Sequence, residues 1–311
     1  MPILVYVYGL AASCFLGVGF VLQQDAAARA PLADILSFRL LLDLMKVPRW
    51  LLGIGFMVVG QLLSALALSL GDVSRVAPLL ATNLLFAMAL ARRISGQRLG
   101  RTGWAGVVLL SGGVAVFVAA GSPQGNDDAQ IGPLRRWLVI GAVIAVALLM
   151  VMIARHLRLA EEPPWLAAGA GVLYGLQDAL TRDASTVLEE SGIGGLVTTW
   201  QPYTIVTSAV VGLVLVQSAF EAGPLRQSLP ALTAANPLSG IACSIGFLGD
   251  TVRVTPLAML GEIVGLGAAV SAIFLLGRHP AMPSGGSGLS DDEPAADGSG
   301  QPQQRNSPGR P

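Results

Sequence analysis

The stretch GDVSRVAPLLATNLLFAMALARRISGQRLGRTGWAGVVLLSGGVAVFV, residues 71–118, decides the fold. It predicts one apolar helix that begins at Pro78 and a second that begins at Gly103, with a hairpin rich in arginine between them. A proline suits the first turn of a helix, where no backbone N–H is needed. Two apolar runs joined by a short basic turn predict a pair of membrane-crossing helices.

The same pattern recurs in weaker form about half a chain later. Aligning Asn83 with Asn236 also aligns Gly96 with Gly249, so both pairs share one offset of 153 residues. Each glycine falls in a turn between two apolar runs. An internal duplication of hydrophobic helices is typical of transporters built from repeats.

Composition places the whole chain in the membrane class. Of 311 residues, 53% are hydrophobic and 12% are charged, and the mean hydropathy is +0.66. A soluble domain carries about 25% charged residues. The formal net charge of zero indicates no nucleic-acid partner. Cys14 and Cys243 both lie in apolar runs and show no metal or redox spacing, so we interpret them as packing residues. We therefore expect an all-α, polytopic membrane protein.

Nine apolar segments predict transmembrane helices. They are residues 3–23, 51–70, 78–91, 103–120, 137–154, 165–185, 196–217, 228–247 and 256–277. Residues 31–49 differ, because Arg39, Asp43 and Lys46 interrupt the apolar residues and fall on one side of a helix. This pattern favours an amphipathic helix at the membrane surface, with a tenth span as the alternative.

The segments group into one transmembrane domain, residues 1–280, and a tail. Repeat one covers about residues 3–120, a linker helix covers 137–154, and repeat two covers about 165–277. Residues 281–311 are rich in Pro, Gly, Ser, Asp and Gln and hold almost no apolar side chains. Such a segment cannot bury enough surface to fold, so we expect a disordered tail.

Basic residues predict the orientation of the chain. The loops after the first and third spans carry four basic residues each, and further arginines follow the fifth, seventh and ninth spans. The positive-inside rule then places these loops and the tail in the cytoplasm, which implies the plasma membrane. With nine spans, the first and sixth helices, where Gly19 matches Gly175, run in opposite directions. The two repeats are therefore expected to be inverted.

A resemblance agrees with this arrangement. The run LLGIGFMVVGQLLSALALSLGDVSRVAPLLATNLLFAMALARRISGQRLGRTGWAGVVLLSGGVAVFVAAGSP, residues 51–123, resembles the drug/metabolite transporter superfamily (EamA-like), and most closely its NIPA-type magnesium-transporter branch. Residues 217–256, QSAFEAGPLRQSLPALTAANPLSGIACSIGFLGDTVRVTP, resemble the closing block of the wider superfamily. The resemblance covers most of residues 3–277. The acid usual in the first hairpin is Gln97 here, whereas Asp250 keeps it in the second.

The resemblance implies a secondary transporter that works by alternating access. In the NIPA-type branch the solute is Mg²⁺, which enters down the membrane potential. In the wider superfamily it is a small metabolite or drug exported against protons, and Glu262 would carry the proton. The lipid bilayer is the expected surrounding, no cofactor is implied, and a homodimer remains open.

Two carboxylates inside predicted spans are candidates for coupling or solute binding, because ionisable groups at membrane depth are costly. Glu262 lies in the run GEIVG, whose GxxxG spacing lets another helix approach closely. It is the expected metal ligand if Mg²⁺ is the solute; pairing with an arginine or contact with water is the alternative. Asp178 follows Tyr174 by one turn, and neutralisation by Arg182 at i+4 is its structural alternative.

Uncharged polar residues complete the candidates. Asn83 and Asn236 are equivalent under the repeat, and Pro237 removes the hydrogen bond to the Thr233 carbonyl. This leaves a polar spot for a cation, a sugar or an amine, with contacts between helices as the alternative. Three further polar residues on neighbouring spans, each of which alone favours packing over binding, are Gln61, Gln201 and Tyr203.

The sequence lacks the motifs that common enzyme classes require. The sequence has no HExxH, GxSxG or P-loop motif, and its histidines, His156 and His279, flank spans. We expect a transporter with a cavity at the membrane midplane, lined by the third and eighth predicted helices, with Glu262 and Gln61 nearby. The alternative is a membrane scaffold or a lipid-handling partner of envelope enzymes. Glu262→Gln separates the two, since only a transporter would lose flux.

Overall fold

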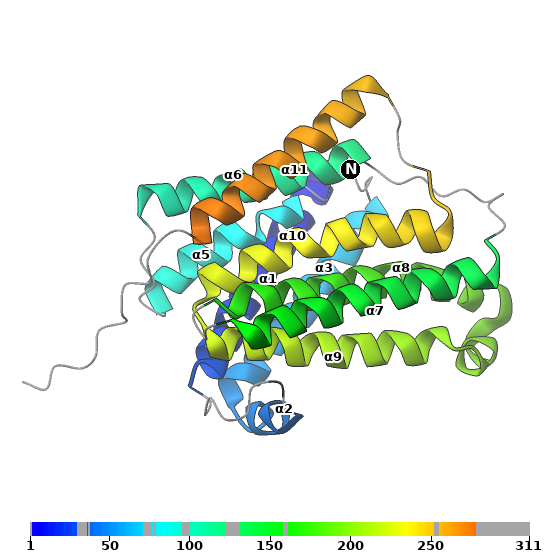
Figure 1. The fold of residues 1–311 in the computed structure, drawn as a ribbon, viewed down its shortest axis with the longest axis horizontal. Helices are drawn as coiled ribbons and strands as arrows, with labels where there is room; N and C mark the ends of the chain where they lie inside the picture. Colours follow the sequence, from blue (N-terminus) through cyan, green and yellow to red (C-terminus); the bar gives the residue numbers. More distant parts are fainter. Residues whose placement is uncertain are drawn as a thin grey trace, which may run out of the picture. The chain divides into compact units, whose positions relative to one another are not determined.

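The computed structural model describes residues 2–29, 36, 38–70, 76, 79–94, 100–121, 131–157, 161–251 and 255–277 (Figure 1). Every element in this part of the chain is a helix, which confirms the all-α prediction. The helices are α1 (Pro2–Ala27), α2 (Phe38–Leu44), α3 (Pro48–Leu70), α5 (Asn83–Ile94), α6 (Arg101–Gly121), α7 (Pro133–His156), α8 (Pro163–Thr198), α9 (Gln201–Ala222), α10 (Leu225–Cys243), the π-helical turn η2 (Ser244–Leu248) and α11 (Pro256–Gly277).

Seven of the described helices are long and apolar enough to cross a membrane: α1, α3, α6, α7, α9, α10 continued by η2, and α11. Their outward faces carry large apolar side chains, such as Leu138 of α7, which is 63% exposed. Water would not tolerate apolar surface on this scale. These helices therefore indicate a membrane protein. The predicted spans 78–91 and 165–185 fall on α5, of 12 residues, and α8, of 36, which are not among the seven.

The boundary between the sixth and seventh predicted spans agrees only in part with the structure, because the helix breaks at Gly192, inside the predicted gap, but is helical on both sides of it. The sequence analysis ended one span at residue 185 and began the next at 196, but α8 continues to Thr198 and α9 begins at Gln201. Residues 186–190, TVLEE, include good helix formers that extend the helix beyond its apolar part. The break comes at Gly192, where φ is 67°, a left-handed conformation that glycine adopts without strain.

In the segment 31–49, the described residues before α3 contain one helix, α2, of seven residues. A helix of this length is about 10 Å long, which is too short to cross a bilayer. Its apolar side chains Leu40, Leu41 and Leu44 are buried, whereas Arg39 and Asp43 face outward. The amphipathic pattern is therefore confirmed, and the alternative of a tenth span finds no support in α2. Residues 30–35 and 37 lie outside the described residues.

Close glycine contacts hold the helices together, and one of them occurs twice. A Cβ atom on Gly17 of α1 would lie 2.9 Å from the Asn83 carbonyl oxygen and 2.9 Å from the backbone nitrogen four residues further along α5. On Gly175 of α8, a Cβ would lie 2.7 Å from the Asn236 carbonyl oxygen and 2.5 Å from the backbone nitrogen four residues further along α10. The two asparagines are the pair aligned from the sequence alone.

Helices α6 and α11 pack side by side and antiparallel (Figure 1). Gly113 and Gly265 face each other, because a Cβ on either would lie 2.7–2.8 Å from the carbonyl oxygen of the other. Gly106, near the start of α6, contacts Leu276 near the end of α11, and Gly261 contacts the last turn of α6. The GxxxG spacing of α11 therefore brings two backbones together, as predicted.

Residues 1–280 form one compact unit. The predicted linker helix 137–154 is α7, which packs against α8 and η2. The expected tail, residues 281–311, and the hairpin residue Gln97 lie outside the described residues.

Candidate functional site

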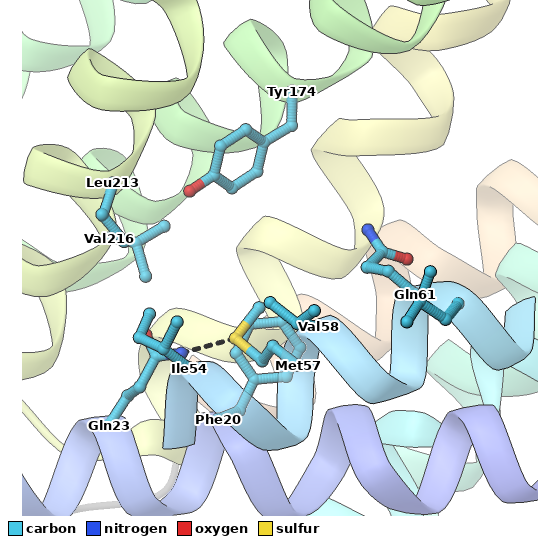
Figure 2. Close-up of a pocket in the computed structure, with 10 residues that line it drawn as sticks. Phe20, Gln23, Ile54, Met57, Val58, Gln61, Tyr174, Leu213 and Val216 are labelled. Carbon is cyan, nitrogen blue, oxygen red and sulfur yellow. Dashed lines mark hydrogen bonds between the residues drawn. The ribbon is translucent and has the colours of Figure 1, made fainter. Parts of the chain in front are cut away.

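A cavity of about 370 Å³ lies between α1 and α3 on one side and α8 and α9 on the other (Figure 2). Its lining residues are Phe20, Gln23, Ile54, Met57, Val58, Gln61, Leu62, Tyr174, Leu213 and Val216. The sequence analysis expected a cavity on the third and eighth predicted helices, which are α5 and α10. Neither of these helices lines the cavity described here. Gln61 is the one candidate residue predicted from the sequence that lies among the described residues of its wall.

Glycines explain why the helices that form the walls come in pairs. Helices α1 and α3 approach closely at Gly19 and Gly53, where a Cβ on Gly53 would lie 3.0 Å from the Gly19 carbonyl oxygen. In α8 and α9 the ring of Tyr174 lies against Gly212, whose Cβ would come within 2.6 Å of a ring carbon. Each pair is held tightly within itself, and the cavity lies between the pairs.

The cavity wall is apolar apart from Gln23, Gln61 and Tyr174, and none of the described residues that line it is charged. Figure 2 shows the Tyr174 hydroxyl pointing from α8 into the space near Leu213 and Val216, while Gln61 extends its amide from α3 toward the same space. A mostly apolar pocket with a few placed polar groups is typical of small-molecule sites. Without a facing charge, an ionic solute would lose hydration and gain no partner.

Two buried glutamines join the helix pairs at the cavity, and we call Gln23 and Gln217 the amide pair. Gln217 of α9 donates from Nε2 to Oε1 of Gln23 on α1, with an N···O distance of 2.6 Å. Gln23 in turn donates from Nε2 to the sulfur of Met57, the dashed line in Figure 2. A thioether sulfur is a weak acceptor. The Oε1 atom of Gln217 is buried and has no hydrogen-bond partner.

Charged groups gather where α1 ends. Asp25 is buried and forms ion pairs with Arg29 and Arg49, with N···O distances of 3.0 Å and 3.2 Å. Nearby, the backbone N–H of Leu36 donates to the Ser218 hydroxyl of α9 at 2.9 Å. The ends of α1 and α9 and the start of α3 therefore share one end of the bundle, which the sequence analysis assigned to the cytoplasm.

A second group of charges, the arginine–aspartate cluster, comprises Arg136, Arg182, Asp183, Gln201 and Asp250. Arg182 of α8 binds Asp250, the residue two positions after η2, at 2.5 Å. Arg136 of α7 lies 3.7 Å from Asp183 of α8, and Gln201 of α9 donates to the same carboxylate at 2.9 Å. The cluster thus ties α7, α8, α9 and η2 together. Gln201, a predicted binding residue, contributes to this network and does not line the cavity.

Aromatic rings pack beside the cluster. The rings of Trp137 and Trp200 lie 5.0 Å apart, and Trp200 meets Phe247 edge to face at 6.1 Å. The Arg136 guanidinium lies 5.4 Å from the centre of the Phe247 ring, a distance typical of a cation–π contact. These contacts hold the starts of α7 and α9 against η2.

Asp178 has a different surrounding from the one expected. The sequence analysis offered neutralisation by Arg182 as an alternative, but that arginine binds Asp250. Asp178 is exposed and makes no hydrogen bond or ion pair with any residue in the described part of the chain. Asp178 lies four positions after Tyr174, so both side chains lie on the same side of α8. The carboxylate is therefore one helical turn from the cavity wall.

Glu262 lies outside the cavity. It is half-buried on α11, and its Oε1 atom would lie 3.1 Å from a Cβ on Gly121, the last residue of α6. Glu262 therefore belongs to the contact between α6 and α11. The structure separates it from Gln61, which the sequence analysis placed nearby.

The remaining candidates divide into two kinds. The side-chain oxygens of Asn83 and Asn236 are both buried and have no hydrogen-bond partner in the described part of the chain, a feature shared by the two positions aligned from the sequence. Tyr203 is 61% exposed, and its hydroxyl donates to the Val197 carbonyl at 2.9 Å. Neither asparagine nor Tyr203 lines the cavity.

The sequence analysis missed the amide pair and gave Tyr174 no role. In the sequence, Gln23 and Gln217 are the last residues of two predicted apolar spans, 3–23 and 196–217. A signal was present, because further polar residues follow each within a turn, Gln24 and Asp25 on α1 and Ser218 on α9. All three are buried, which marks a polar surface inside the bundle.

Among the described residues, no group of three or more His, Cys, Asp or Glu side chains could hold a metal ion. No family model matches the chain, and no solved structure matches it. The chain is 28% identical over 288 residues to an uncharacterized protein of Corynebacterium glutamicum. The aligned region covers 91% of this chain and 98% of that protein, so the similarity extends over nearly the whole of both.

Proposed function

We propose that the protein is a secondary transporter that moves a small organic solute across the membrane by alternating access. The observation that carries this proposal is the cavity between the pair α1/α3 and the pair α8/α9. The first pair belongs to the predicted first repeat and the second pair to the second. A site between repeats is where such transporters bind their solutes. The resemblance to the drug/metabolite transporter superfamily supports the same function.

The composition of the wall favours an organic solute over Mg²⁺. Mg²⁺ is bound by oxygen ligands and usually by one or two carboxylates. The cavity offers two amides and a phenol, in a wall that is otherwise apolar. Glu262, the carboxylate first assigned to Mg²⁺, lies against the end of α6. We therefore place the NIPA-type ion function second.

We further propose that the two halves are inverted repeats of nine spans in total, with α5 and α8 as the additional crossings. Two observations support this. The contact of Gly17 with Asn83 is repeated by Gly175 with Asn236. Helices α6 and α11, which occupy equivalent places, pack antiparallel around Gly113. Equivalent helices that run in opposite directions are expected when a two-fold axis lies in the membrane plane.

The proposed movement is a rocking of one half against the other around the cavity. The bond from Gln217 to Gln23 and the bond from Leu36 to Ser218 both join the halves at the end of the bundle where α1 and α9 end. These bonds would close that end of the cavity, and its opening requires that they break. The basic residues at this end, Arg29 and Arg49 among them, favour the cytoplasmic side of the plasma membrane, with the C-terminal tail on the same side.

Asp178 replaces Glu262 as the proposed coupling group. It lies one turn from Tyr174 in the wall, and its helical neighbour Arg182 is bound to Asp250. A carboxylate without a fixed counter-ion can exchange a proton or a cation as the cavity changes its access. In reconstituted vesicles, Asp178→Asn is expected to abolish accumulation driven by an ion gradient while downhill exchange of solute continues. Glu262→Gln is expected to leave both intact.

The test of the proposed function is the thermal midpoint of the purified protein against amides, amines, amino acids, sugars and divalent cations. A solute that binds the folded state raises the midpoint by mass action. Gln61→Leu is expected to weaken that response, while Tyr203→Phe, far from the cavity, serves as the matched control. If no compound shifts the midpoint and no flux follows, the protein is better described as a membrane scaffold or a lipid-handling partner.

A further inference from the structure

The amide pair is only half formed. Two primary amides can exchange two hydrogen bonds, since each carries both a donor and an acceptor. Here Gln217 donates to Gln23 at 2.6 Å, but the reciprocal bond is missing. One amide hydrogen of Gln23 goes to the sulfur of Met57, and among the described residues the Gln217 oxygen is buried without a partner. An unpaired buried acceptor is unfavourable, so this arrangement destabilises the protein when no solute is bound.

Two poorly bonded groups lie at neighbouring positions: the Gln23 amide donor, which faces a weak sulfur acceptor, and the Gln217 oxygen. Gln23 lines the cavity, and Gln217 is hydrogen-bonded to it and follows the lining residue Val216. A group that presents C=O and N–H side by side would satisfy both. Its oxygen would replace a weak sulfur acceptor at Gln23, and its N–H would reach the unpaired oxygen of Gln217.

The rest of the wall limits the solute further. No charged side chain lines the cavity, and seven of its ten lining residues are apolar: Phe20, Ile54, Met57, Val58, Leu62, Leu213 and Val216. A carboxylate would place a negative charge beside the free oxygen of Gln217 without a cation in the wall. An ammonium ion would leave its hydration for a wall that offers no carboxylate. An ester or ketone has no N–H to donate.

We propose that the cavity binds an uncharged solute with a carboxamide group on an apolar body, held at that group by Gln23 and Gln217. This inference rests on the proposed function, because it names the chemical class of the transported solute. The carboxamide carbonyl accepts from Nε2 of Gln23, and its N–H donates to Oε1 of Gln217. The apolar body lies against Phe20, Leu213 and Val216. Binding therefore completes the hydrogen bonding of the amide pair.

Four compounds with the same ring separate the possibilities: benzamide, methyl benzoate, benzoate and benzylammonium. The measurement is the thermal midpoint of the full chain in lipid nanodiscs as each compound is titrated. Benzamide is expected to raise the midpoint in a saturable way, and the other three are not. Methyl benzoate keeps the carbonyl but lacks the donor, so it isolates the contribution of Gln217. An equal response to the ester, or no response to benzamide, overturns the proposal.

Variants then locate the site. Gln23→Leu is expected to weaken the apparent affinity for benzamide at least about tenfold, the size of one hydrogen bond of about 1.4 kcal/mol. Gln217→Met, which removes the acceptor at similar volume, provides a second test should the first variant fail to fold. Gln201→Leu is the matched control, because its amide bonds to Asp183 in the arginine–aspartate cluster. A benzamide response that survives in both cavity variants contradicts the proposed contacts.

The outcomes also separate this inference from the proposed function. A midpoint shift with benzylammonium, benzoate or Mg²⁺ that Gln61→Leu weakens would leave a transporter but overturn the carboxamide class. The absence of any response to the broad panel of solutes, together with an absence of flux, would overturn transport itself.

Discussion

The arginine–aspartate cluster and the amide pair both bring together polar side chains that are distant in the sequence, yet they are built differently. In the cluster, both carboxylates are paired: Asp250 has a cation and Asp183 has both a cation and an amide donor. Two other polar contacts are missing there among the described residues, because Oε1 of Gln201 and Nε of Arg136 are buried without a partner. In the amide pair, one hydrogen bond forms, one donor faces a sulfur atom, and the Gln217 oxygen has no partner. No residue of the cluster is among the described residues that line the cavity of Figure 2, whereas Gln23 lines it.

This difference distinguishes a polar network that stabilises the fold from one that is available to bind a solute. A buried polar network whose members are bonded holds helices in place, and removal of one partner is costly. A network left half bonded next to a cavity is poorly optimised for stability and gains when a solute completes it. Function commonly persists at such unfavourable positions. The comparison predicts opposite effects of substitution in the two regions.

The largest effect on stability is expected in the arginine–aspartate cluster. Asp250→Ala removes a carboxylate whose side chain is 2% exposed and leaves Arg182 without its partner. We expect the free energy of unfolding to fall by about 2 kcal/mol, below the full cost of a buried ion pair because Arg182 is half exposed. The matched control is Asp43→Ala, whose ion pair with Lys46 is exposed and contributes about 0.5 kcal/mol or less. Equal losses in the two variants, measured by unfolding in mixed detergent, would remove the distinction.

A smaller loss is expected for Gln201→Leu. The substitution removes the hydrogen bond to Asp183 and costs about 1 kcal/mol. Because Gln201 does not line the cavity, the midpoint shift produced by the solute should stay the same size. A loss of the solute response in this variant would show that the cluster and the cavity are coupled.

The amide pair should respond in the opposite direction. Replacing Gln23 and Gln217 together by Leu removes both amides, including the unpaired oxygen. We expect the free energy of unfolding to stay the same or rise by up to about 1 kcal/mol, since apolar groups replace a poorly bonded polar pair. Solute binding should be lost in the same protein. Destabilisation as large as that of Asp250→Ala would mean that the pair serves stability and not binding.

The smallest change in stability is expected for Tyr174→Phe. The hydroxyl points into the cavity, so its removal should alter the free energy of unfolding by less than about 0.5 kcal/mol. Solute affinity should fall about threefold to tenfold if the hydroxyl donates to the solute. Tyr203→Phe, which loses only a bond to the Val197 carbonyl on an exposed surface, is expected to leave affinity unchanged. Isothermal titration with the solute that shifts the midpoint compares the two.

Much of the fold could be predicted because its signals are local. Runs of apolar residues predicted the described crossing helices, the spacing of Gly261 and Gly265 predicted close packing, and Arg39 and Asp43 marked α2 as amphipathic. Helix ends were less certain, because α8 continues through polar residues until Gly192 allows the chain to turn. Hydropathy identifies the apolar part of a helix that can lie in a bilayer, but it does not predict where the helix ends outside the bilayer.

The site was much less predictable, because it depends on which sides of the helices pack against each other. Gln61 was expected beside a cavity on α5 and α10 but lines a cavity between other helices, whereas Gln201 and Glu262 lie in other contacts. The asparagines aligned by the repeat occupy matching contacts, but neither lines the cavity.

By itself, the sequence determined the helical class and the membrane pattern and predicted the alignment of Asn83 with Asn236, because apolar runs and glycine spacings act over a few turns of one helix. Only the tertiary structure decided that Arg182 binds Asp250, 68 residues away, and that Gln217 binds Gln23 across 194 residues. A polar side chain in a helix bundle has several neighbouring helices as possible partners. Which one it meets is settled by the packing of all of them together.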